Sequence, residues 1–318
     1  MKPTRMLLPF FFASLALAGC NARNAQRIAV IQLGTHTSLN EINDAVQAKL
    51  KASGNYEIVY KNAEFSLDVA AQIVSSLKGQ VDLAIPIATP IAQACYNGFD
   101  EKTPIVFAAV SDPVEAGLLK NLDAPEGNIT GTSDAIQVAS ILDRALLIDP
   151  ELDELGFIYN PAEANSVSNK AKIEAYCEEK GIALRSVSIS SAGETKEIAT
   201  SLISRVDAIF VTDDNTVASA MSVLGETCRE SGKPCYVGAD SMVKDGGMFS
   251  IGINYTTLGT ETASMALDIL GGKKVSEVPV KVFNDNLNLY LNVDYAEEAG
   301  ITIPDSILND PMLKEIRG

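Results

Sequence analysis

The chain has 318 residues, of which 47% are hydrophobic and 21% are charged, so it is long enough for two α/β lobes and too long for a typical single core. Its 41 acidic residues outnumber its 25 basic residues and give a net charge of −16 at pH 7, which disfavours DNA or RNA as a partner. The sequence contains no low-complexity tract and has the composition of a globular protein.

Residues 1–20 have the pattern of an export signal. Lys2 and Arg5 precede an apolar run over residues 6–16, which is too short to span a membrane. The segment ends in Leu17-Ala18-Gly19-Cys20, which resembles the lipobox of bacterial lipoproteins, in which the cysteine is diacylated and becomes the first mature residue. The prediction is therefore an extracytoplasmic protein anchored to a bacterial membrane through the lipid on Cys20. The alternative is an ordinary secretory signal that happens to end in cysteine.

Four further cysteines follow. Cys228 and Cys235 flank a short loop, and a disulfide between them is possible because an exported protein reaches an oxidising compartment. Cys95 and Cys177 are expected to be buried small apolar residues on helices. The sequence has no Cys-x-x-Cys motif and a single histidine, so neither a metal site nor a cofactor is predicted.

Apolar runs and helical spacing alternate along the first part of the chain, as in a βαβ series with a parallel sheet. Ser38 with Glu41 three residues later predicts a capping box, Ser66 predicts an N-cap, and Thr89 predicts another with Pro90 at the first helical position. Strands are expected over residues 27–33, 56–61, 81–88 and 104–110, with helices over residues 38–54, 66–79 and from 89 onward.

Glycine and short polar residues over 127–134 mark a crossover, after which a second series of strands and helices begins. The two halves have the same order of elements, which predicts two doubly wound parallel-sheet lobes that face each other with their strand-end loops. Helices are expected over residues 135–148, 165–181 with Asn165 as the cap, 195–204, 214–230, 257–270 and near 296–298; strands are expected over 154–159, 183–189, 207–212, 234–238, 248–253 and, as two short pieces, within 279–291.

No enzyme signature is found in the sequence. It has no GxSxG elbow, no GxxxxGK[ST] phosphate loop and no GxGxxG fingerprint. Any Ser–His–Asp or Cys–His arrangement would depend on His36, the only histidine. By default such a loop histidine is a surface group, but its place at the carboxyl end of a strand leaves a position in the cleft equally open. Catalysis is therefore not indicated.

Polar residues gather at the predicted carboxyl ends of the strands. Each of them also caps helices for local reasons, but together they would ring one cleft with hydroxyls and helix N-termini suited to a carboxylate and with acidic groups suited to an ammonium. That inventory fits a zwitterion with an apolar side chain, which Phe107, Tyr159 or Tyr255 could contact. The strand-end residues are Gln32, His36, Thr89, Pro90, Ser111, Asp112, Asn160, Asn165, Ser166, Asp213, Asp214, Asn215, Asp240 and Ser241.

Several longer runs resemble the ABC-transporter substrate-binding lipoproteins described for tryptophan and tyrosine uptake, and they follow one another over nearly the whole mature chain. They are Ala88-Thr89-Pro90, Ala109-Val110-Ser111-Asp112-Pro113-Val114 with Ala116-Gly117-Leu118, Gly127-Asn128-Ile129-Thr130-Gly131-Thr132-Ser133-Asp134, Tyr159-Asn160-Pro161 with Glu163-Ala164-Asn165-Ser166, Thr212-Asp213-Asp214-Asn215-Thr216-Val217-Ala218-Ser219-Ala220, Gly238-Ala239-Asp240-Ser241, and Gly252-Ile253-Asn254-Tyr255 with Leu258-Gly259. One departure is Ala239, where the family often has an acidic residue before the aspartate.

The resemblance implies a type I periplasmic-binding fold whose lobes are joined by three crossovers. Lobe 1 would comprise residues 26–132 and about 251–275, and lobe 2 residues 133–250 and about 276–318. It also implies that the protein captures a small molecule, with an aromatic amino acid favoured, and delivers it to a membrane permease and its ATPase without catalysis.

By similarity with type I binding folds, Thr89 and neighbouring N–H groups would hold the ligand's carboxylate, and Asp240 or Asp214 its ammonium. Ser133 and Asp134, at the end of one of the resembling runs, are counted with the ligand-binding residues.

Three alternatives stay open. The solute could instead be a branched amino acid, a purine or a sugar, although the absence of Trp and an aromatic content of 6% argue mildly against a sugar. A hydrolase on a doubly wound fold would need His36 for activity. A ligand-sensing module of a membrane receptor would share the same fold, and gene adjacency to a permease and an ATPase would favour transport over sensing.

Overall fold

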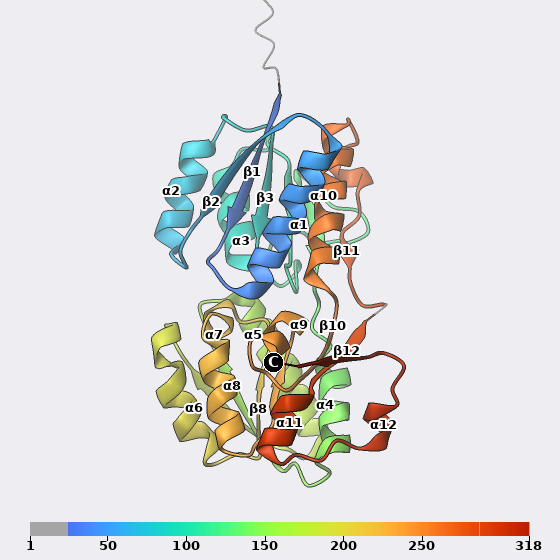
Figure 1. Ribbon diagram of the computed structural model, residues 1–318. Coiled ribbons are helices and arrows are strands. Elements are labelled where there is room, and N and C mark those ends of the chain that lie inside the picture. The colour runs from blue at the N-terminus through green and yellow to red at the C-terminus, as the bar shows by residue number, and fades with distance from the viewer. Residues whose placement is uncertain (1–24, 286, 318) are drawn as a thin grey trace, which may run out of the picture.

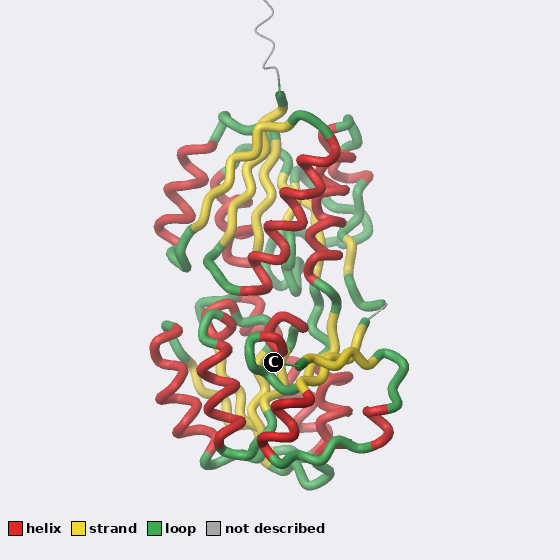
Figure 2. The backbone as a smooth tube through the Cα atoms, viewed as in Figure 1, coloured by secondary structure: helices red, strands yellow, loops and turns green. Residues whose placement is uncertain are grey.

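A computed structural model describes residues 25–285 and 287–317, so the predicted signal peptide and Cys20 lie outside the described residues. The chain forms two α/β lobes, one above the other in Figure 1, each with helices packed around a central sheet. The described chain enters the first lobe at its pole far from the second lobe, where β1 begins (Figure 1). In Figure 2 the strands of the first sheet extend from the outer pole of the first lobe toward the junction between the lobes.

In the part of the chain that the structure describes, the sheet of the first lobe has six strands in the order β11-β5-β4-β3-β1-β2, and every neighbouring pair is parallel. Near-continuous apolar runs such as β3 form its centre because helices cover both faces. The strands are β1 (Gln26–Gln32), β2 (Tyr56–Asn62), β3 (Leu83–Ile87), β4 (Ile105–Phe107), β5 (Ile129–Ser133) and β11 (Lys281–Val282); the helices are α1 (Thr37–Ser53), α2 (Leu67–Leu77), α3 (Thr89–Gly98) and α10 (Tyr255–Leu270).

Within the described residues, the sheet of the second lobe has seven strands in the order β13-β12-β10-β9-β8-β6-β7, and β10 with β12 is its one antiparallel pair. The strands are β6 (Glu154–Tyr159), β7 (Ala183–Ser188), β8 (Ala208–Val211), β9 (Cys235–Val237), β10 (Phe249–Gly252), β12 (Asn288–Asn292) and β13 (Leu313–Ile316); the helices are α4 (Val138–Ile148), α5 (Ala164–Lys180), α6 (Thr195–Ile203), α7 (Asn215–Ala218), α8 (Met221–Glu230), α9 (Asp240–Lys244), α11 (Val293–Ala299) and α12 (Asp305–Leu308).

The chain passes between the lobes three times: after β5, between β10 and α10, and after β11. The expected α/β fold with two parallel-sheet lobes is confirmed. The third passage differs from the expectation, because β11 pairs with β5 and so belongs to the first sheet. The chain therefore returns to the second lobe after Val282, not near residue 276.

Several predicted helix caps are wrong. His36 is the N-cap of α1, so Ser38 and Glu41 form no capping box, and both contact the other lobe instead. Ala88, with a φ of 82°, is the N-cap of α3, which places Thr89 inside the helix. In the second lobe Glu163, not Asn165, is the N-cap of α5, and the helix expected over residues 214–230 is divided into α7 and α8. The predicted cap at Ser66 is confirmed, since its side chain accepts from the N–H of Val69.

The four described cysteines are buried free thiols, so the disulfide considered between Cys228 and Cys235 is not formed. The pKa of Cys235 is well above its usual range because its thiol bonds to that of Cys228 and is buried. Within residues 25–285 and 287–317, no helix has both the length and the apolar character that a membrane crossing requires.

Candidate ligand-binding site between the lobes

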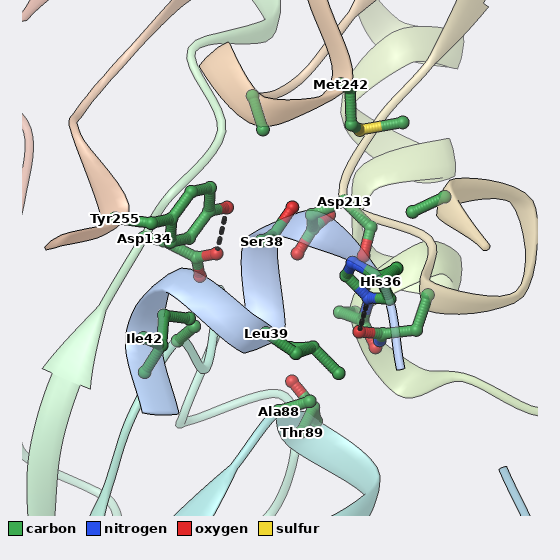
Figure 3. A pocket seen from close by; sticks show the side chains of 15 residues that line it. His36, Ser38, Leu39, Ile42, Ala88, Thr89, Asp134, Asp213, Met242 and Tyr255 are labelled. Atoms are coloured by element: carbon green, nitrogen blue, oxygen red, sulfur yellow. Dashed lines mark hydrogen bonds between the residues drawn. The ribbon is translucent and has the colours of Figure 1, made fainter. Parts of the chain in front are cut away.

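A cavity lies between the lobes, where the strand-end loops of both sheets meet (Figure 3). Both lobes and the first crossover contribute to its wall, which combines apolar side chains with carboxylates, amides and hydroxyls. The residues that line it are His36, Ser38, Leu39, Ile42, Ala88, Thr89, Ala109, Asp134, Asn165, Asp213, Asn215, Ala218, Ala239, Met242 and Tyr255.

Two carboxylates, Asp134 and Asp213, face this cavity and are joined through Ser111. The Ser111 hydroxyl lies 3.0 Å from Oδ1 of Asp134 and also contacts Oδ2 of Asp213. Tyr255 donates its phenolic hydrogen to Oδ2 of Asp134 at 2.8 Å, and Asn169 donates to Oδ1 of Asp213 at 2.6 Å. Because the Ser111 hydroxyl has one hydrogen, it donates to only one of the two carboxylates at a time. Its contact with the other carboxyl group is a hydrogen bond when that group carries a proton and donates to the Ser111 oxygen.

The electrostatics of this pair favour a cation. Removal from water, with the nearby Asp134, raises the pKa of Asp213 to about 7. Burial also raises the pKa of Asp134, while its bonds from Tyr255 and Ser111 oppose that rise. No lysine or arginine is found among the described residues that line the cavity. An ammonium group placed between the two carboxylates would supply the missing positive charge.

The N-terminus of α3 provides the opposite charge. The first turn of an α-helix leaves backbone N–H groups without partners in the helix, and the helix dipole makes that end positive. Thr89 stands at the first position of α3 and lines the cavity, and Pro90 has no N–H to contribute. A carboxylate at this end of the cavity would therefore find N–H donors and a hydroxyl.

His36 and Asn215 meet across the two lobes. Nε2 of His36 lies 3.2 Å from Oδ1 of Asn215. Burial lowers the pKa of His36 to about 4, so the ring is neutral at pH 7 and carries its hydrogen on Nε2 when Asn215 accepts. The amide of Asn215 is fixed by Glu163, which accepts from its Nδ2 at 2.6 Å and from its backbone N–H at 3.0 Å. Glu163 thus determines which end of the amide faces His36.

Direct contacts hold the lobes together on both sides of the cavity. Ser38 and Ser241 share a hydrogen bond of 2.5 Å, and Lys244 donates to Glu41 at 2.9 Å. On the other side, Asp112 accepts from Ser168 at 3.1 Å. Bonds of this kind can form only when the two lobes have approached each other, so the structure describes a closed arrangement.

Among the predicted site residues, six line the cavity: His36, Thr89, Asp134, Asn165, Asp213 and Asn215. Ser111 lies just behind the wall and joins the two carboxylates, and Ser133 lies behind Ser111 with its hydroxyl on the Ser111 carbonyl. The predicted residues that do not line the cavity are Gln32, Pro90, Ser111, Asp112, Ser133, Asn160, Ser166, Asp214, Asp240 and Ser241.

The two carboxylates assigned to the ammonium by resemblance have other partners. Asp214 caps α7 by accepting from the N–H of Val217 at 2.9 Å, and it also accepts from Ser166 at 2.7 Å. Asp240 is buried and pairs with Lys244 at 2.9 Å. Asp213, the neighbour of Asp214, lines the cavity in their place. The side chains of adjacent residues past the end of a strand point in different directions. The sequence holds no signal that tells which of the two aspartates points into the cavity.

Other predicted residues make contacts within their own lobe. Gln32 is buried and donates to Asn40 at 2.9 Å within the first lobe. Among the aromatic candidates, Phe107 is buried in the core and Tyr159 stacks on Phe157, so only Tyr255 reaches the cavity.

Comparisons with known proteins agree with this geometry. A profile of the family described as ABC transporter substrate binding protein matches residues 27–314. A tyrosine-binding protein from Clostridioides difficile is 30% identical over 280 residues, which cover 86% of this chain and 81% of the relative. A leucine-binding protein from Thermotoga maritima shares the fold alone, at 15% identity and a TM-score of 0.58 over 78% of this chain and 83% of that one.

Two solved structures of similar identity differ in how well they match. The structure of an ABC domain in complex with L-Trp from Streptococcus pneumonia is 32% identical and has a TM-score of 0.86, with 92% of this chain and 100% of that chain covered. A ligand-free, open substrate-binding protein from Clostridium difficile is 30% identical with a TM-score of 0.68, with 92% and 99% covered. The lobes of this chain are therefore arranged as in the ligand complex.

Two parallel-sheet lobes closed over a cavity with carboxylates on one wall and a helix N-terminus on the other define a small-molecule binding protein of the type I periplasmic-binding fold. More particularly, the chain belongs to the family of ABC transporter substrate-binding proteins.

Proposed function

We propose that the protein binds an aromatic L-α-amino acid between its lobes and presents it to an ABC importer. The observation that carries this proposal is the opposite charge preference of two walls of one cavity. Asp134 and Asp213 suit the α-ammonium, and the N-terminus of α3 at Thr89 suits the α-carboxylate. A zwitterionic amino acid satisfies both walls at once.

The apolar part of the wall suits a flat side chain. Leu39 and Ile42 come from α1 of the first lobe, and Met242 comes from α9 of the second (Figure 3). A methionine sulfur makes favourable contacts with aromatic rings, and the neutral imidazole of His36 adds a planar surface. The relatives named above, one a tyrosine-binding protein and one in complex with L-Trp, support the aromatic class.

We also propose that binding and closure suffice for this function, without catalysis, and that a lipid on Cys20 holds the protein on the extracytoplasmic side of a bacterial membrane. The lipobox-like run before Cys20 supports the anchor. The described chain starts at the pole of the first lobe far from the cavity, so a tether there would leave the cleft free (Figure 1). Metabolic labelling with a palmitate analogue, compared between the full chain and Cys20→Ser, tests the anchor.

The binding proposal is tested by a thermal-shift screen of the mature chain against amino acids, sugars and nucleosides, followed by calorimetry on each hit. A ligand that binds only the folded state raises the melting temperature in proportion to its excess over Kd. The proposal expects shifts with L-Tyr, L-Trp or L-Phe and none with the corresponding amine or the amino acid amide, because each lacks the carboxylate. Hits confined to sugars or nucleosides would contradict it.

A further inference from the structure

The turn between β2 and α2 carries two adjacent non-glycine residues in the left-handed region. The φ angle is 50° at Glu64 and 59° at Phe65, and the N–H of Ser66 closes the turn on the carbonyl of Ala63 at 2.9 Å. Side chains with a Cβ adopt this conformation only at a cost in free energy, and such turns ordinarily use glycine, asparagine or aspartate. Strain of this kind persists where the surrounding structure fixes it and often accompanies a function.

The strained turn places the Phe65 ring on His36. The two rings are stacked, with centroids 6.4 Å apart and planes inclined by 18°. The N–H of Phe65 donates to the carbonyl of Leu33 at 2.8 Å, which ties the turn to the loop that carries His36. Phe65 as a residue remains 39% exposed, so its burial does not explain why the turn is kept in this conformation.

Gly34 leaves the space that this ring occupies. A Cβ added at Gly34 would lie 2.3 Å from two carbon atoms of the Phe65 ring, and the three atoms nearest to it all belong to that ring. Gly34 has no left-handed φ, so an alanine there is compatible with the backbone. The smallest possible side chain at this position would therefore meet the Phe65 ring first and displace it.

We infer that Phe65 is a positioning residue of the ligand site: its ring, held by the strained turn and admitted by Gly34, fixes the imidazole of His36 as a planar wall of the cavity. From the second lobe, Asn215 accepts a hydrogen bond from Nε2 of His36 when the lobes close, and Asn215 is itself held by Glu163. Phe65, Gly34 and His36 all belong to the first lobe, so the stack forms before closure. The effect on ligand affinity rests on the proposed function, but the placement of His36 does not.

The first test uses the fact that His36 is the only histidine of the chain. In the mature chain without a histidine tag, proton NMR shows a single imidazole titration. Phe65→Ala exposes the ring to water, so the pKa of His36 is expected to rise toward 6.5, and Phe65→Tyr is expected to restore the wild-type titration. An unchanged titration in Phe65→Ala, or no rescue by Tyr, would overturn the inference. This test needs no ligand.

The second test separates position from mere stability. Gly34→Ala is expected to reproduce the raised pKa of His36, because it displaces the same ring. Phe65→Gly relieves the left-handed strain and is expected to melt no lower than Phe65→Ala while sharing its titration. Leu67→Ala, which removes a 53% exposed side chain two residues away, serves as the control and should titrate like wild type. A shift in the control equal to that of Phe65→Ala would contradict a specific role.

Affinity is then measured by calorimetry with L-Tyr and L-Trp. If wild type binds, we expect Phe65→Ala and Gly34→Ala to weaken binding by about tenfold, as for a lost aromatic contact, and Phe65→Tyr to retain it. Equal affinity in Phe65→Ala would remove the link between this stack and the ligand. If wild type binds neither amino acid, the proposed function fails, while the titration of His36 still decides the role of Phe65.

Discussion

The two walls of the cavity are built differently. The second lobe presents charged and amide groups that are already fixed by neighbours, as Asn169 fixes Asp213 and Glu163 fixes Asn215. The first lobe presents mainly shape, through Leu39 and Ile42 of α1, together with the N-terminus of α3. From this difference we expect the loss of a charge in the second lobe to weaken binding most, whereas changes to Leu39 or Ile42 in the first lobe should alter which ligand side chain is accepted.

The largest effect is expected from Asp213→Asn. The variant keeps the shape of the side chain but removes a charge that faces the ligand's ammonium in a site shielded from water. We expect the affinity for an aromatic amino acid to fall by about 100-fold or more, measured by calorimetry. The melting temperature of the ligand-free variant should stay equal or rise, because an uncompensated carboxylate is gone. Binding at wild-type strength would show that Asp213 does not hold the ammonium.

Asp214→Ala gives the matched comparison within the second lobe. Asp214 accepts from the N–H groups of Asn160 and Val217 and from the Ser166 hydroxyl, and it does not line the cavity. Its removal costs a helix cap and leaves buried donors unsatisfied, so the free energy of unfolding should fall by about 2–4 kcal/mol in urea titrations. The folded variant should bind more tightly than Asp213→Asn. A reversed order of the two variants in affinity would contradict the assignment.

This pair also marks how far the sequence could predict the site. The strands and helices of both lobes follow from local periodicity, and β8 was predicted within a residue or so of its observed end. Which of two adjacent aspartates enters the cavity depends on the path of the chain beyond the strand and on packing against Ser166 and Asn169. No local pattern contains that information.

The contacts between the lobes could not be predicted from the sequence for a related reason. Ser38 and Glu41 have the spacing of a capping box, and the local rule was satisfied by the sequence. In the structure their partners are Ser241 and Lys244, about 200 positions away, and these compete with the local cap. The sequence also predicts the wrong lobe for the edge strand β11, because a strand that pairs through two residues carries almost no sequence signal.

The pH dependence of stability should differ between the two walls. Asp213, with a pKa of about 7 against 3.8 for a free side chain, binds a proton more readily when folded, so its contribution falls as pH rises from about 4 to about 7. His36 acts in the opposite direction, since its lowered pKa of about 4 makes folding less favourable as pH falls below 6.5. Other groups whose pKa is raised, such as Asp214 with a pKa of about 8, are present both in the wild type and in the Asp213→Asn variant, which are compared below.

The difference in melting temperature between wild type and Asp213→Asn isolates this effect. At about pH 5 the two should differ little, and at about pH 7.5 wild type should be the less stable of the two when ligand-free. Saturation with the amino acid should remove the deficit, because the ammonium replaces the proton. A difference that grows toward acid pH would show that Asp213 is ionised in the closed, empty protein.

The smallest effect is expected at the contact between the walls themselves, from Glu41→Gln. Lys244 donates to Glu41 across the lobes and to Asp240 within its own lobe, and the side chain of Asp240 is only 1% exposed, so the lysine cannot be replaced without leaving a buried carboxylate unpaired. Glu41→Gln removes the contact between the lobes alone. Because such partly exposed pairs contribute at most about 1 kcal/mol, we expect Kd to rise by about fivefold or less and its salt dependence to weaken.

Glu57→Gln is the matched control for this last variant, since Glu57 pairs with Arg27 inside the first lobe and takes no part in closure. Its Kd and salt dependence should equal those of wild type. A loss of affinity in Glu41→Gln as large as that in Asp213→Asn would contradict this comparison of the walls. Closure contacts outside the cavity would then contribute as much to affinity as the charge that faces the ligand.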